Sequence, residues 1–454
     1  MTLEISSSDH QSGNGDRERE RQTAIEQSTL RVLNRRLLPL LFFSYLIACL
    51  DRANVSFAAL HMNRDLGFGP AVYGFGAGIF FVGYSLCEVP SNFILVRVGA
   101  RRWFARILVT WGILAVSMMF VRTARAFYLL RFLLGAAEGG FFPGVLWYLG
   151  NWFPASHRAR AIALFSTGTP VAQAIGGVLA GGLLQLSGRL GFAGWQWLFL
   201  VEGLPACVLG FLVFRYLPER PAEARWLEPE ECEWLIAQLA VDRSHEMHDS
   251  ANFGAALRNP VVWRLGATLF LATTVAYAQV LWLPQILKGF GTLSDMRVGL
   301  VVSGMGVLAT VLLYANGVHS DRSGELHGHA AIPVLLTCGG WLLLSRVKGL
   351  IACSLALAVL SCRKSMEPPF WALSRSFLTG TGAAGGFALI NSMATFGGFV
   401  GPALLGLLLK ATGGYGAAFI ALAALDASVA VLVLGLRRAH ATSPTPTITA
   451  SSVP

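Results

Sequence analysis

Residues 37–60 read LLPLLFFSYLIACLDRANVSFAAL, and this stretch decides the fold class. A helix needs about 20 predominantly apolar residues to cross the hydrocarbon core of a bilayer, and the stretch is long enough to do so. It nevertheless carries Asp51 and Arg52 inside the apolar run. A charge inside a membrane helix costs at least about 2.5 kcal/mol and persists where it is paired or faces a water-filled cavity. The stretch therefore predicts a membrane helix that carries functional residues.

The rest of the chain repeats this apolar pattern. Of its 454 residues, 54% are hydrophobic and 13% are charged, whereas soluble domains carry about 25% charged residues. Apolar stretches of spanning length occur about twelve times, in two sets of about six. The fold class predicted is an all-α polytopic membrane protein with two pseudo-symmetric six-helix bundles. We predict a disordered cytoplasmic tail over 1–34, bundles over 35–217 and 261–438, a cytoplasmic linker over 218–260 and a second disordered cytoplasmic tail over 439–454.

Basic residues set the predicted orientation. The formal net charge is +10, and the Lys and Arg residues gather in the loops on the side of the two termini. The positive-inside rule then places both termini in the cytoplasm. This distribution also explains the charge without a nucleic-acid partner. Within the linker, PEECEWLIAQL from Pro229 predicts a short amphipathic helix. The seven cysteines include no CxxC pair, so we expect no disulfide framework, no metal site and no cofactor.

The first group of candidate site residues is Asp51, Arg52 and Asn54, which lie within one helical turn. Arginine stays protonated and can bind a carboxylate through two hydrogen bonds, so Arg52 is a candidate for substrate binding. Asp51 can exchange a proton if burial raises its affinity for one. The alternative is a structural ion pair that locks helices together.

Arg131 and Glu138 form the second group. They are seven residues apart and therefore share one face of a helix, about 10 Å apart along its axis. We expect them to face the cavity without neutralising each other directly. The alternative for Arg131 is a side chain that extends to the membrane interface.

A third group lies in the tenth apolar segment, 350–374, where Arg363, Lys364 and Glu367 precede a double proline. These charges form a possible additional site that lines a wet vestibule and attracts anions. Alternatively, they mean that the segment has a different register. Neutral candidates for lining a polar cavity come from their mid-segment placement: Tyr84, Gln279, Trp371 and Asn391.

Several short motifs together resemble a known family. Their order and spacing are similar to those of the anion:cation symporter group of the major facilitator superfamily, which includes permeases for tartrate, phthalate, hydroxyphenylacetate, sugar acids and nicotinate. The resemblance covers residues 35–438. The motifs are LDRANV from Leu50, EVPSN from Glu88, GARRW from Gly99, RFLLGAAEG from Arg131, WQWLF from Trp195, PPFWAL from Pro368 and GGFVGP from Gly397.

This resemblance implies proton-coupled uptake of a small organic carboxylate by alternating access. It implies that acidic residues at Asp51 and Glu138 carry protons and that Arg52 and Arg131 lie near the substrate. It also implies cavity contacts for the following residues: Tyr84, Trp371 and Asn391. One departure is the charged pair at 363–364, where the family is normally uncharged.

Other functions stay open at this point. A facilitator or exporter of a neutral solute or drug has the same fold, and a receptor that binds without transport is a further alternative. An enzyme is disfavoured because the chain has no HExxH or GxSxG motif. We expect a monomeric transporter in the plasma membrane, with a bacterial inner membrane favoured. Its partners would be a small organic anion, protons and the lipid bilayer.

Overall fold

The computed structural model describes residues 6–246, 257–347, 349–378 and 383–441, and these residues are almost entirely helical. The first half of the chain forms α1 (Ser6–Arg36), α2 (Leu38–Asp65), α3 (Pro70–Val98), α4 (Ala100–Ser117), α5 (Ala124–Glu138), α6 (Phe141–Gly150), α7 (Ala155–Ser166), α8 (Gly168–Leu184) and α9 (Gly194–Tyr216). The rest forms α10 (Pro229–Glu246), α12 (Pro260–Gly289), α13 (Asp295–Ser323), α14 (His327–Leu344), α15 (Leu350–Leu360), α16 (Glu367–Phe377), α17 (Ala383–Thr412) and α18 (Tyr415–Ala441).

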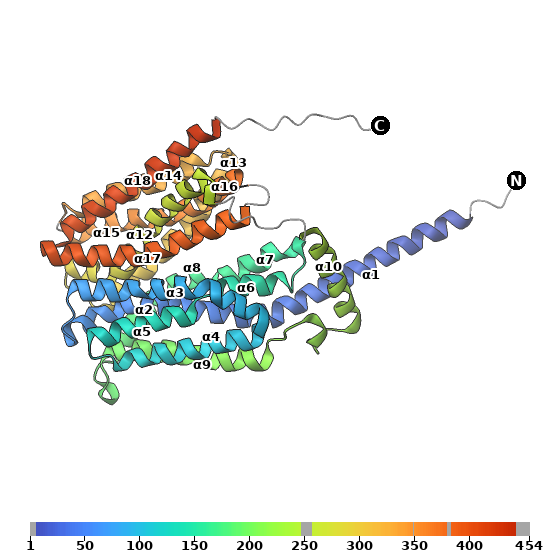
Figure 1. The fold of residues 1–454 in the computed structure, drawn as a ribbon, viewed down its shortest axis with the longest axis horizontal. Helices are drawn as coiled ribbons and strands as arrows, with labels where there is room; N and C mark the ends of the chain where they lie inside the picture. The colour runs from blue at the N-terminus through green and yellow to red at the C-terminus, as the bar shows by residue number, and fades with distance from the viewer. Residues whose placement is uncertain (1–5, 247–256, 348, 379–382, 442–454) are drawn as a thin grey trace.

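Two helical bundles make up the body of the molecule, α2 to α9 and α12 to α18 (Figure 1). In the amino-terminal bundle α4 packs along α9 and α3 along α5. In the carboxy-terminal bundle α12 packs along α17 and α14 along α18. Fully buried tryptophans contribute to both bundle interiors, with Trp111 in the first and Trp282 and Trp341 in the second. The predicted all-α fold with two bundles is confirmed.

Eleven helical stretches among the described residues are long and apolar enough to cross a membrane. The predicted tenth segment is not one of them, because it forms α15, a short 3-10 helix over Ser361–Met366 and α16. Two adjacent cations, Arg363 and Lys364, lie in the 3-10 turn. Pro368 and Pro369 follow at the start of α16, where their missing N–H groups are tolerated. The sequence around the charges therefore interrupts the tenth helix.

Gly140 divides the predicted fourth segment into α5 and α6. Its φ of 88° is left-handed, a conformation that glycine adopts without a steric cost. A Cβ at this position would lie 2.5 Å from the Ser91 hydroxyl oxygen, so the close approach of α3 also requires glycine. The break ends α5 directly after Glu138 and leaves this carboxyl in the last turn of the helix.

The structure corrects the prediction of a disordered tail over 1–34, because residues 6–34 belong to α1. Contacts with α10 provide the physical reason. Arg21 pairs with Glu230 at 2.7 Å, and the Ser28 hydroxyl donates to Glu231 at 2.5 Å. The amphipathic helix predicted from Pro229 is confirmed as α10. Of the second predicted tail, residues 439–441 continue α18 and 442–454 lie outside the described residues.

Several hydrogen bonds between the bundles lie at the end remote from α1 and α10. His61 of α2 contacts Asp295 of α13 at 2.8 Å, and the Tyr73 hydroxyl of α3 donates to the Leu281 carbonyl at 2.5 Å. At the same end Gly177 of α8 packs directly against the backbone of α13. Small residues allow such close helix crossings in membranes. The bundles are thus joined at the remote end.

Candidate functional site

Arg52 and Glu138 form an ion pair that joins α2 to α5. The Arg52 side chain is 23% exposed and the Glu138 side chain is 1% exposed, so the pair lies at the boundary of the bundle interior. Glu138 Oε1 accepts from Arg52, while its buried Oε2 has no hydrogen-bond partner among the described residues. An anion can therefore approach Arg52 from its exposed side, and a proton on Glu138 would free the guanidinium for it.

Asp51 precedes Arg52 and points to another face of α2, about 100° away around the helix. Its Oδ2 accepts a hydrogen bond of 2.9 Å from the Trp111 indole of α4. Its Oδ1 is buried and has no hydrogen-bond partner in the described part of the chain. Asp51 and Arg52 therefore do not pair with each other, and the alternative of a structural ion pair that locks helices together stays open for Arg52 with Glu138.

Glu202 of α9 is a third buried carboxyl, which the sequence reasoning did not select. The residue is 2% exposed, and no hydrogen bond from a described residue reaches either of its carboxyl oxygens. It interacts electrostatically with Asp51, and its carboxyl lies next to the buried side-chain amide of Asn54, a potential hydrogen-bond donor. The same rule that selected Asp51 could have found Glu202, because it is an acidic residue within an apolar run. The predicted Asn54 thus lies with the buried carboxyls of Asp51 and Glu202.

Arg131 holds α5 against α3. Its side chain is 1% exposed, which excludes an extended side chain at the membrane interface. It donates to the carbonyls of Gly76 and Ala77 at 3.4 and 3.2 Å, and its guanidinium lies 4.8 Å from the centre of the Phe80 ring. As predicted, Arg131 and Glu138 do not pair with each other. Arg131 therefore holds α5 and α3 together next to the site.

Aromatic rings lie near the Arg52 guanidinium. The guanidinium lies 5.5 Å from the Tyr84 ring centre and 5.8 Å from that of Phe80. Tyr277 of α12 also interacts with Arg52, and its ring lies 4.2 Å from Phe81 of α3. The predicted Tyr84 thus contacts the charged pair, whereas Tyr277 went unpredicted because an aromatic in an apolar helix is usually a packing residue. Since α3 and α12 belong to different bundles, Arg52 lies where the bundles meet.

Comparison with protein families identifies this architecture, because the model of the Major Facilitator Superfamily matches residues 41–387. The chain belongs to this superfamily. It is 42% identical to an Agrobacterium vitis protein named "Putative tartrate transporter", over 91% of this chain and 92% of the relative. It is 42% identical to a Pseudomonas putida protein named "Putative metabolite transport protein NicT", over 83% of this chain and 87% of the relative. It is 41% identical to an Acinetobacter baumannii protein named "Quinolone resistance transporter", over 86% and 90%. The predicted resemblance is confirmed, and the chain is a multi-pass membrane transporter and not an enzyme.

Solved structures show the same major facilitator fold. A partially occluded, inward-open form of the xylose transporter XylE from E. coli matches with a TM-score of 0.70 at 14% identity, over 88% of this chain and 97% of XylE. An inward-facing, occupied bacterial homologue of the human lysosomal transporter Spinster matches with a TM-score of 0.69 at 16% identity, over 90% and 96%.

The remaining neutral candidates are Gln279, Trp371 and Asn391. Gln279 of α12 is half-buried, and its side chain makes no hydrogen bond to a described residue. Trp371 is half-buried and packs on Phe370 and Phe387, with ring centres 5.6 and 6.1 Å away. Asn391 of α17 is exposed. The structure therefore brings Tyr84 to Arg52 and leaves these three without a described polar contact to the pair.

The tenth segment carries a second buried ion pair, in which Arg363 binds Asp426 of α18. Asp426 is fully buried and also accepts from the Thr337 hydroxyl of α14 at 2.9 Å. Arg363 donates in addition to the backbone carbonyl of Ala272 in α12. The prediction that Arg363 lines a wet vestibule and attracts anions is wrong, because its charge is compensated inside the bundle. Asp426 was not predicted as a site residue from the sequence, although it is an acidic residue within an apolar run.

The other two charges of this segment have different surroundings. Lys364 is half-buried and has no ion-pair partner among the described residues, and Glu367 is exposed at the first turn of α16. An acidic residue in that turn interacts favourably with the helix dipole. The three charges therefore do not form one site.

A histidine cluster lies where α13 meets α14. Glu325 Oε2 contacts His329 Nδ1 at 3.2 Å, and His329 Nε2 contacts His319 Nδ1 at 2.5 Å. Partial burial favours the neutral acid, but hydrogen bonds from the Gly328 backbone and from His329 outweigh it and lower the pKa of Glu325. Within the described ranges, no three His, Cys, Asp or Glu residues gather as metal ligands would.

Proposed function

We propose that the chain is a proton-coupled symporter for the uptake of a small organic carboxylate. It would act as a monomer in the plasma membrane, with both termini in the cytoplasm. The ion pair of Arg52 and Glu138 is the observation that carries this proposal, because the arginine is partly exposed while its carboxylate is buried. The relative named as a tartrate transporter supports a carboxylate substrate.

Proton and substrate would favour each other through this pair. When Glu138 is ionised, it occupies Arg52 and repels a substrate carboxylate. When Glu138 takes up a proton, the guanidinium is released and can bind the substrate in a region where water screens charge poorly. By linkage, substrate on Arg52 equally favours the proton on Glu138. The coupling thus follows from competition between two carboxylates for one arginine.

The carboxyl cluster of Asp51 and Glu202 would hold a further proton. Two buried carboxyls that interact cannot both be ionised without a large cost, and each has an oxygen without a described partner. Trp111 donates only to Asp51 and favours its ionised form. We therefore assign the shared proton to Glu202 in the resting state, with transfer toward Asp51 during the cycle.

Alternating access would use the contacts between the bundles. With cytoplasmic termini, the joined end faces outward, as in the inward-facing solved structures that share the fold. To face outward, the protein would have to separate His61 from Asp295 and Gly177 from α13. The two bundles would rock about the Arg52 region, as inverted-repeat transporters do.

Uptake into proteoliposomes tests the proposal. Purified protein is given a panel of labelled carboxylates with an inward proton gradient, and Arg52→Ala is compared with Arg125→Ala, which removes an exposed arginine at the start of α5. We expect accumulation of at least one carboxylate by the wild type and by Arg125→Ala and none by Arg52→Ala. Equal accumulation by both variants would contradict the role of Arg52.

The second candidate is an exporter of a neutral solute or drug, favoured by the relative named as a quinolone resistance transporter. In that case Arg52 and Glu138 would act as a structural pair. Drug efflux that persists in Arg52→Ala, together with no carboxylate uptake by the wild type, would select this function.

A further inference from the structure

A pocket of about 730 Å³ lies at the α1/α10 end of the molecule, far along α2 from the joined end. It is formed by the last turns of α1, the connection between α6 and α7, and the start of α7. The residues that line it are Gln27, Leu30, Arg31, Asn34, Arg35, Phe153, His157, Arg160 and Ala161. All of its charged or titratable side chains are basic, and none is a carboxylate.

Nearby acidic residues are engaged elsewhere. Glu230 and Glu231 of α10 bind Arg21 and Ser28 on a more amino-terminal part of α1. Asp242 of α10 accepts from the backbone N–H of Ala155 at 2.7 Å. These contacts fix α1 and the start of α7 and thereby build the pocket without placing a negative charge in it.

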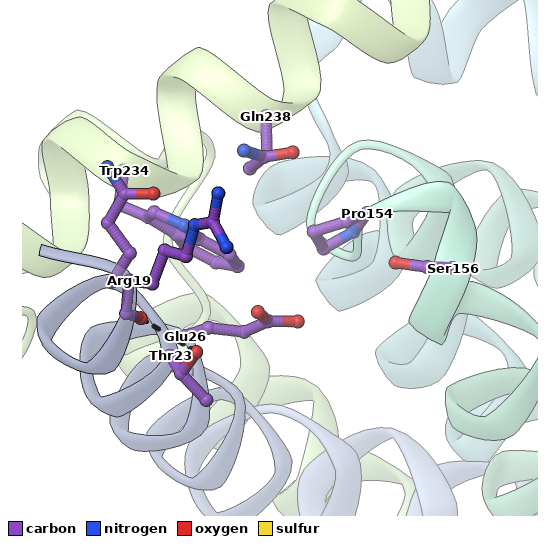
Figure 2. A pocket seen from close by; sticks show the side chains of 8 residues that line it. Arg19, Thr23, Glu26, Pro154, Ser156, Trp234 and Gln238 are labelled. Carbon is purple, nitrogen blue, oxygen red and sulfur yellow. Dashed lines mark hydrogen bonds between the residues drawn. The ribbon is translucent and has the colours of Figure 1, made fainter. Parts of the chain in front are cut away.

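Glu26 is the nearest acid along α1, and it lines a separate pocket of about 350 Å³ (Figure 2). Figure 2 shows it on the α1 side of that pocket, across from Pro154 and Ser156. It contacts His157 at 3.6 Å, so this histidine lies between the two pockets. Glu26 can compensate at most the charge of His157 and leaves the arginines without a counter-charge.

Three arginines thus converge without an ion-pair partner. Arg31 and Arg35 are four residues apart and share one face of α1, Arg160 of α7 lines the same pocket, and all three are exposed to solvent. Each makes no ion pair with a described residue. Converging guanidinium groups repel one another unless an anion lies between them, and their planar forks suit phosphate and carboxylate oxygens.

We propose that this pocket, defined by Arg31, Arg35 and Arg160, binds a phosphate- or carboxylate-bearing anion at a site separate from Arg52. The anion would link α1 to α7 and stabilise this end of the amino-terminal bundle. In the proposed orientation it has two sources, a free anion of the cytoplasm or the headgroup of an anionic phospholipid in the inner leaflet. The apolar Leu30, Phe153 and Ala161 in the lining suit the glycerol part of a lipid.

Thermal unfolding of the purified full-length protein tests the site. In one arm inorganic phosphate is titrated in detergent, with chloride at matched ionic strength as the reference. In the other arm the protein is placed in phosphatidylcholine nanodiscs with or without phosphatidylglycerol. A ligand that binds only the folded protein must raise the Tm. The variants are Arg31→Ala, Arg160→Ala and Arg160→Lys, and the matched control is Arg36→Ala, an exposed arginine next to the pocket that does not line it.

We expect phosphate, phosphatidylglycerol or both to raise the Tm of the wild type and of Arg36→Ala. Loss of one charge-assisted contact in Arg31→Ala or Arg160→Ala should weaken the apparent Kd about tenfold or more, and Arg160→Lys should recover part of it. A shift in the nanodisc arm alone assigns the lipid headgroup, and a shift in detergent assigns a free anion. No shift in either arm, or equal shifts in Arg160→Ala and Arg36→Ala, would overturn the site. Transport through Arg52 is measured separately and does not enter this readout.

Discussion

In the amino-terminal bundle Glu138, Asp51 and Glu202 all keep buried carboxyl oxygens without hydrogen bonds from described residues. In the carboxy-terminal bundle Asp426 has both oxygens bonded, one to Arg363 and the other to Thr337. The helices concerned correspond in the two bundles, since α9 and α18 are each the last of their bundle. Buried polar groups are normally satisfied, and exceptions need an explanation. This difference supports the proposal that proton exchange takes place in the first bundle, whereas the charges of the second bundle compensate each other inside it.

The largest expected effect is a loss of stability when the ion pair of Arg363 and Asp426 is broken. Arg363→Met leaves Asp426 buried without its cation, which should destabilise the protein by about 3–5 kcal/mol. Unfolding in detergent, followed by circular dichroism, measures the loss. The double variant Arg363→Met with Asp426→Leu should recover most of it, because an apolar pair of similar volume replaces a buried ion pair at little cost. A single variant as stable as the wild type would show that the pair does not hold the broken tenth helix.

Matched variants of Asp426 in α18 and Glu202 in α9 compare the structural roles of the two buried acids. Asp426→Asn should cost about 3 kcal/mol, because it leaves the buried Arg363 uncompensated. Glu202→Gln should change stability by less than about 1 kcal/mol, because no hydrogen bond from a described residue is lost. Both variants are measured by the same unfolding assay. Equal losses would mean that Glu202 is as structural as Asp426 and would remove it from the proton pathway.

Close packing of the two bundles at the joined end gives a third prediction. A Cβ on Gly177 would overlap the Gly299 carbonyl, whereas a Cβ on Gly304 of α13 meets nothing within 4 Å. Overpacking costs about 1–3 kcal/mol, here only in the state with this end closed. Gly177→Ala should therefore shift the protein toward the state with this end open, and Gly304→Ala should not. Labelling of a cysteine introduced at Met296 measures the shift, and equal labelling in both variants would contradict it.

The smallest expected effect concerns Glu325, outside the spanning helices. Its lowered pKa means that the ionised form is stabilised on folding. The contribution is present above the ordinary glutamate pKa of about 4.3 and is lost as the pH falls through the lowered value. Glu325→Gln should be slightly less stable at pH 7 and equal to the wild type in strong acid. A Tm difference that does not change between pH 7 and pH 3 would contradict this origin.

Much of the fold could be predicted from the sequence, because apolar length and charge distribution act on each segment separately. The two bundles and α10 follow from such local patterns. The break of the tenth segment was visible only as an unusual charge pair at Arg363 and Lys364. The helix α1 was not predicted, since its folding depends on distant partners on α10.

The candidate site was predicted less completely. A charged residue in an apolar run is a candidate site residue, and this rule identifies Asp51, Arg52, Arg131 and Glu138. The rule does not predict which of these residues pair with each other. The structure pairs Arg52 with Glu138 and gives Arg131 to backbone carbonyls of α3. Such pairings depend on helix rotation and on contacts between segments far apart in the sequence.

The most direct test of the central claim is the pH dependence of substrate affinity in purified protein. Binding of the carboxylate found by uptake is measured by calorimetry from pH 5.5 to 8 for the wild type and for Glu138→Gln. The wild type should bind the carboxylate more weakly as the pH rises, because ionised Glu138 competes for Arg52. Glu138→Gln should bind with the low-pH affinity of the wild type and with little dependence on pH. An undiminished pH dependence in Glu138→Gln would contradict competition between Glu138 and the substrate as the origin of coupling.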